Sequence, residues 1–72
     1  MSGLIKRSFS LVGHRTSVAL EAEFWTALSS LAAVRGITLT ALVVGLDSAR
    51  PPDRPLASVL RVHALLAQRD EC

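Results

Sequence analysis

The sequence has little of what small domains ordinarily use to stabilise themselves. Its 72 residues include one cysteine, Cys72, which excludes a disulfide within the chain. A structural zinc site normally takes about four clustered ligands, whereas His14, His63 and Cys72 are far apart. We therefore expect neither a metal nor a cofactor. Because a single domain of this length has a marginal core, we expect a second subunit to supply the missing stability.

Long hydrophobic runs are also missing. No stretch approaches the 18 or so apolar residues that cross a membrane. Lys6 and Arg7 are not followed by the apolar segment of a secretory signal. These observations predict a cytoplasmic protein that makes no membrane contact. Hydrophobic residues nevertheless make up 50% of the chain, and this surplus favours a face that is covered by another subunit.

The groups that catalysis requires are absent as well. Acid–base chemistry needs convergent carboxylates, or a histidine beside a nucleophile, within a cleft. Asp47 and Asp53 flank a loop, and neither is spaced to meet a histidine. The chain has no glycine-rich phosphate loop. We expect no enzymatic activity and assign no catalytic residues.

Positive charge is concentrated at the front of the chain. Residues 1–20 contain Lys6, Arg7 and Arg15 and no acidic residue, whereas the remainder holds five arginines against six carboxylates. A basic segment of this kind is typical of an arm that meets phosphate groups, although a solvated basic tail would have the same composition.

The basic segment has the alternation of a β-strand. From Arg15 to Leu20 one face is mostly apolar (Thr16, Val18, Leu20) and the other is mostly small or charged (Arg15, Ser17, Ala19). Phe9 and Leu11 alternate with serines upstream. If Gly13-His14 were a two-residue turn, Leu11 would face Thr16 and Phe9 would face Val18. An extended arm fits the same residues equally well.

Helical periodicity follows the strand. It predicts a first helix over residues 22–35 that ends at Gly36, and a second helix that Thr38 caps. The second helix ends near Arg50, because Pro51-Pro52 cannot continue it. A third helix is predicted over residues 56–68.

Taken together, these motifs resemble a known family. "KRS" at Lys6, "GHRTSV" from Gly13, "FW" at Phe24 and "RGITL" from Arg35 are similar to short bacterial ribbon-helix-helix proteins. "LASVLRV" from Leu56 is similar to the additional C-terminal helix that these proteins carry. The resemblance implies a mainly α fold with one N-terminal β-strand, in which two chains intertwine as a homodimer around an intermolecular antiparallel ribbon. Three parts are expected: 1–12 as a basic arm or extra strand, 13–50 as the ribbon-helix-helix core, and 51–72 as a proline-rich loop and C-terminal helix.

The resemblance also implies a function. It implies a repressor-like transcriptional regulator that binds double-stranded DNA in a sequence-specific manner. The outward residues of the ribbon would contact base edges in the major groove: Arg15, Ser17 and Ala19. Ala19 departs from the family pattern, which often has a polar or basic residue there. Phosphate contacts are expected from the arm, the turn and the start of the second helix: Lys6, Arg7, His14, Thr38, Leu39 and Thr40.

A second copy is expected for two reasons. The family forms dimers, and a lone strand would leave its backbone groups unpaired unless the same strand of another chain joined it about a two-fold axis. The dimer core would contain Thr16, Val18, Leu20, Phe24, Leu28, Leu31, Leu42, Val43 and Leu46. A tetramer is a further option. The alternative function is that of a protein-interaction module or antitoxin-like adaptor that binds a partner protein through its C-terminal helix.

Overall fold

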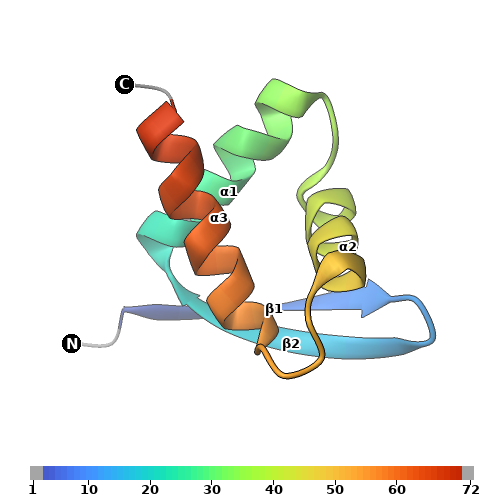
Figure 1. Cartoon of the computed structure of the whole chain (residues 1–72). Helices are drawn as coiled ribbons and strands as arrows, with labels where there is room; N and C mark the ends of the chain where they lie inside the picture. Colours follow the sequence, from blue (N-terminus) through green and yellow to red (C-terminus); the bar gives the residue numbers. More distant parts are fainter. Residues whose placement is uncertain (1–2, 71–72) are drawn as a thin grey trace.

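A two-stranded antiparallel sheet forms one side of the molecule, and three helices lie on one of its faces (Figure 1). The computed structural model describes residues 3–70, the last three by their backbone alone, so Cys72 lies outside the described part. The elements follow one another as β1 (Leu4–Leu11), β2 (His14–Glu21), α1 (Ala22–Arg35), α2 (Leu39–Ala49) and α3 (Leu56–Asp70).

The two strands form a hairpin within one chain. Leu11 pairs with His14, so Val12 and Gly13 make the turn, and Gly13 adopts the positive φ of 85° that glycine tolerates best. Of the two alternatives, the hairpin forms, but the register that a Gly13-His14 turn would give is wrong, because Phe9 pairs with Thr16 instead of Val18. The shift is one of two residues, and so it leaves each side chain on its predicted face.

The hairpin also answers the question of whether the basic arm is extended or paired. The sequence predicted one N-terminal strand with the arm as a possible extra strand, and the structure has two strands. β2 finds its hydrogen-bonding partner in β1 of the same chain. A lone unpaired strand is thus no longer a reason to expect a second copy, and the intermolecular ribbon and the homodimer stay predictions.

The helix boundaries confirm the capping signals. Gly36 has φ 72° and donates its N–H to the carbonyls of Ala32 and Ala33, which ends α1. The hydroxyl of Thr38 accepts a hydrogen bond of 3.0 Å from the N–H of Ala41 at the start of α2. α2 ends one residue before Arg50, and α3 continues two residues beyond its predicted end.

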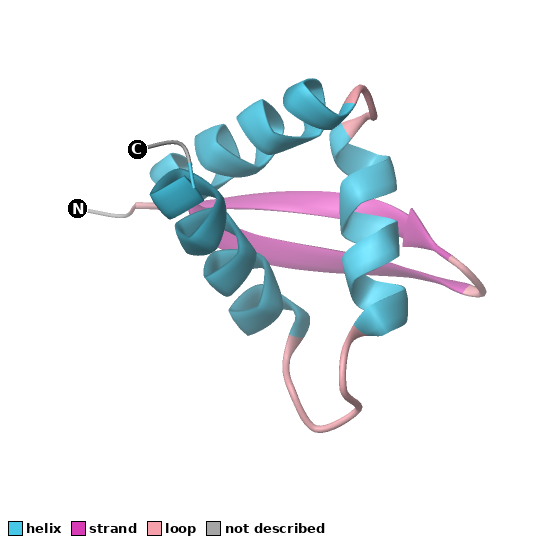
Figure 2. Ribbon diagram, turned by 45° about the horizontal axis from the view of Figure 1, so that its top comes forward, coloured by secondary structure: helices cyan, strands magenta, loops and turns pink. Residues whose placement is uncertain are grey.

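The core lies between the inner face of the hairpin and the three helices, of which α2 crosses both strands (Figure 2). Most of the predicted dimer core is already buried within one chain: Val18, Leu20, Leu28, Leu42, Val43 and Leu46. The other three members are half-buried: Thr16, Phe24 and Leu31. α3 contributes Val59, Leu60 and Ala64 to the same core, so the C-terminal helix is part of the folded body.

Among the described residues, no single helix is long and apolar enough to cross a membrane. The pair α1 and α2 reaches the required length and composition together, but the two helices are bent by 97° at the turn between them.

Candidate functional site

The face of the hairpin that points away from the helices carries most of the chain's N-terminal polar groups. Opposite residues of an antiparallel pair share a face, and the pairs on this side are Ser10 with Arg15, Ser8 with Ser17, and Lys6 with Ala19. All are exposed except the half-buried Ala19. We call these six residues the outer hairpin face.

Two cations stand at opposite ends of this face. Lys6 belongs to β1 and Arg15 to β2. The ion pairs in the described part of the chain join Asp47 to Arg50 and Glu21 to Arg61, so neither cation of the outer hairpin face is neutralised by a carboxylate. Between them, the hydroxyls of Ser8 and Ser17 are 3.0 Å apart and hydrogen-bonded.

A carboxylate does sit at the end of the hairpin, where Glu21 pairs with Leu4. Its Oε1 accepts hydrogen bonds from Nε and Nη2 of Arg61, at 3.2 and 3.1 Å. The backbone hydrogen bond of Glu21 and the Arg61 guanidinium hold the pKa of this carboxyl below its ordinary value. Arg61 thus compensates the negative charge nearest to the outer hairpin face.

Arg7 lies on the opposite side of the hairpin from Lys6. Its guanidinium carbon is 5.4 Å from the centre of the Trp25 ring, a cation–π arrangement. Trp25 is 2% exposed and donates its Nε1–H to the carbonyl of Ile5 at 2.7 Å. Its ring centre is 5.8 Å from that of Phe9. Trp25 therefore packs against the N-terminal strand β1.

The predicted contact residues therefore separate into groups. Arg15, Ser17 and Ala19 share the outer hairpin face with Lys6, which was predicted to contact phosphate with Arg7. His14 is exposed at the start of β2. The start of α2 is not on this face, because α2 packs on the covered side of the hairpin; Thr38 and Thr40 are exposed there and Leu39 is half-buried.

Sequence reasoning missed the contribution of Ser8 and Ser10 to this site. Both lie in a segment that an extended arm would explain equally well, and both join the face only because β1 pairs with β2. The alternation with Phe9 and Leu11 was the available signal, and a turn with glycine in its second position would have fixed the register.

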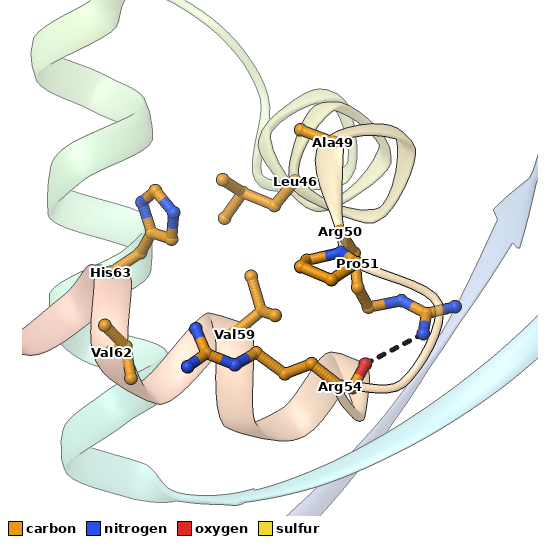
Figure 3. Close-up of a pocket in the computed structure, with 8 residues that line it drawn as sticks. All are labelled: Leu46, Ala49, Arg50, Pro51, Arg54, Val59, Val62 and His63. Carbon is orange, nitrogen blue, oxygen red and sulfur yellow. Dashed lines mark hydrogen bonds between the residues drawn. The ribbon is translucent and has the colours of Figure 1, made fainter.

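A second candidate site is a cleft of about 180 Å³ between α2 and α3. Figure 3 shows Leu46 and Val59 facing each other across it, with His63 on one side and Arg54 extending along its mouth. The Arg50 guanidinium is engaged by the carboxylate of Asp47 and the carbonyl of Arg54. The lining is mostly apolar, and its polar members are His63, Arg50 and Arg54.

Comparison with known proteins agrees with the geometry. A family model described as a ribbon-helix-helix domain matches residues 4–67, which include both strands and nearly all of the helical body. No curated protein and no solved structure matches the chain.

Proposed function

Because the chain belongs to the ribbon-helix-helix family, we propose that it binds double-stranded DNA in a sequence-specific manner. Members of this family are generally DNA-binding transcription regulators, and the fold is a non-enzymatic one. We propose a bacterial, cytoplasmic regulator of the repressor type, without catalytic activity and without a cofactor.

The outer hairpin face is the observation that carries this proposal. A two-stranded β-ribbon fits the major groove, where the edges of all four base pairs can be told apart. Arg15 can donate to O6 and N7 of guanine, and Ser17 can donate to or accept from several bases. Ala19 offers a small apolar contact for a thymine methyl. Its six residues are exposed apart from the half-buried Ala19, no carboxylate occurs between residues 3 and 20, and the opposite face of the hairpin packs on the core.

Phosphate contacts would hold the ribbon in register. The first N–H groups of α2 and the positive end of its dipole favour an anion, and Thr38, Leu39 and Thr40 form that turn. His14 and Arg7 belong to the strands but lie on the helix-facing side of the hairpin, from which they would add contacts to the DNA backbone on the flanks of the ribbon. Such contacts position the protein without selecting a sequence.

The test is a titration of the pure full-length chain against its best duplex, selected from a random pool, and against a scrambled duplex. We expect Arg15→Ala to reduce the discrimination between the two by about 1–3 kcal/mol. Arg35→Ala, which removes a cation from the end of α1, should leave that ratio unchanged. Absence of binding to any duplex at moderate salt would refute the proposed function.

A protein-interaction role is the second candidate. Val62, Leu65 and Leu66 lie at i, i+3 and i+4 of α3 and are 37%, 55% and 46% exposed, which gives this helix an apolar strip on its outer side. A homodimer or a tetramer could form there, as could a complex with another protein. If Leu65→Lys abolishes self-association and leaves DNA binding intact, the strip serves assembly; if the wild type binds no duplex, the interaction role moves ahead.

A further inference from the structure

We propose that the cleft between α2 and α3 binds a small carboxylic acid with an apolar body, of the size of benzoate. None of the residues that line this cleft belongs to the hairpin. The inference therefore goes beyond the proposed function, because the cleft can bind its ligand whether or not the chain binds DNA.

The apolar walls of the cleft are held in place by the fold. Leu46 of α2 and Val59 of α3 are buried members of the core, and they face each other across the cleft (Figure 3). Pro51, in the loop between the two helices, adds a side chain whose ring cannot rotate freely. We expect these walls to exist before a ligand enters, which reduces the cost of ordering side chains on binding.

The volume of the cleft limits the size of the ligand. The cleft measures about 180 Å³, whereas an apolar cavity of about 150 Å³ holds benzene. The cleft is also open on one side. One ring can therefore lie between Leu46 and Val59 while a charged substituent remains at the mouth.

Two nitrogen donors are available at that mouth. The side chain of Arg54 runs from the loop past Val59, and its guanidinium ends on the same side of the cleft as His63 (Figure 3). Among the described residues, neither side chain takes part in an ion pair or a side-chain hydrogen bond. A guanidinium matches a carboxylate with two parallel N–H groups, and an imidazole offers an N–H donor in either protonation state.

The charges around the mouth favour an anion. Within the described part of the chain, the lining of the cleft includes no carboxylate. Arg50 is already bonded to Asp47 at 3.1 Å, so that this pair adds no net charge. Asp53 precedes Arg54 in the loop, but it neither lines the cleft nor forms an ion pair with a described residue. Arg54 thus gives the mouth a positive charge that no bonded carboxylate cancels.

A second copy of the chain is the competing occupant. Val62 belongs both to the lining of the cleft and to the exposed apolar strip of α3, so that an apolar side chain of another copy could enter. Such a side chain would leave the donors of Arg54 and His63 without a partner, whereas a carboxylate would satisfy both. This difference favours the small acid.

The test is a titration of the full-length chain with sodium benzoate at pH 7, followed by the amide signals in NMR spectra and by the melting temperature. Acetate carries the carboxylate without the ring, and benzyl alcohol carries the ring without the charge. We expect benzoate to saturate with a dissociation constant of about 10 mM or below, the range for a ligand of about nine non-hydrogen atoms. Acetate and benzyl alcohol should each bind about tenfold more weakly.

Two variants locate the ligand. Arg54→Gln removes the charge at the mouth and should weaken benzoate by about tenfold or more, as expected for the loss of a charged hydrogen bond. Ala49→Leu, at an exposed position of α2 that lines the cleft, should fill part of the space and abolish saturation. Arg35→Gln removes an exposed arginine from the end of α1 and is the matched control, which should bind as the wild type does. Far-UV circular dichroism verifies that each variant is folded.

Several outcomes would overturn this proposal. Benzoate binding that neither Arg54→Gln nor Ala49→Leu changes would place the ligand elsewhere. Equal binding of benzyl alcohol would mean that the charge plays no part. If benzoate does not saturate and Ala49→Leu lowers the mass found by sedimentation, a second copy occupies the cleft. The proposed function is tested with DNA alone, so it can stand or fall separately.

Discussion

Glu21 occupies the N-cap position of α1, yet its side chain makes no capping hydrogen bond. The carboxylate turns instead to Arg61 of α3, forty residues later in the chain. The same guanidinium lies 5.8 Å from the centre of the Phe24 ring. At the scale of single residues, this contact joins the end of the hairpin to the C-terminal helix and gives the fold a dependence on pH.

The direction of that dependence follows from the lowered pKa of Glu21. A carboxyl whose pKa is lower in the folded chain than in the unfolded chain stabilises the fold above the unfolded pKa, and this contribution is lost as pH falls through the folded pKa. Glu21→Gln should therefore lower the denaturant midpoint at pH 7 and make little difference at pH 2.

Urea titrations at both pH values measure this effect. Glu23→Gln, which removes an exposed carboxylate from the same turn of α1, is the control and should show a smaller difference between the two conditions. An equal loss of stability at pH 7 and pH 2 would mean that the charge of Glu21 is not what stabilises the contact.

At the scale of elements, the helices were the predictable part of the fold. Gly36, Thr38 and Pro51 act within a few residues of themselves, so the sequence locates the ends of α1 and α2 to within a residue. The register of the hairpin was harder to predict from the sequence, because Val12-Gly13 and Gly13-His14 both fit a two-residue turn. The faces of β2 were nonetheless predicted correctly, because strand alternation does not depend on which of these turns is used.

Contacts between distant segments could not be predicted. Nothing in the sequence near Ile5 indicates that its carbonyl accepts a hydrogen bond from Trp25, and nothing near Lys6 separates it from Arg7 until β1 is known to be a strand. The sequence therefore predicted the part of the outer hairpin face that lies on β2, namely Arg15, Ser17 and Ala19. The part that lies on β1 could be recognised only from the pairing of the two strands.

At this scale we predict that the stability of the fold depends on the packing of the C-terminal helix α3. Leu60 is fully buried in the common core, whereas Leu65 on the same helix is 55% exposed. Leu60→Ala should destabilise the fold by about 2–5 kcal/mol, the usual cost of such a cavity, whereas Leu65→Ala should cost less, because it removes only what this exposed side chain contributes when two copies associate. Denaturant unfolding of both variants compares them directly. Equal midpoints would mean that α3 is an appendage.

At the scale of the whole molecule, the chain buries a core of its own but leaves large apolar residues exposed on α1, on the turn after it and on α3: Val34, Ile37, Val62, Leu65 and Leu66. A chain of 72 residues gains little folding stability from its own core alone. We expect helices of two copies to associate, so that sedimentation gives twice the chain mass of 7.7 kDa.

The melting temperature of such a homodimer should rise with protein concentration, since association stabilises the folded state by mass action. Scans over a hundredfold range of concentration provide the measurement. A monomer mass combined with a constant melting temperature would show that one chain is stable by itself.

The pairing of β1 with β2 has a further consequence for how the protein is assembled. The strands are joined by two residues, so this hairpin forms by closing a very short loop, an event of about 1–10 μs. Pairing between strands of two chains has to wait for an encounter, and its rate depends on how much protein is present. Here the step is unimolecular. Each newly made chain acquires its outer hairpin face at the same rate, whether the cell holds many copies or few.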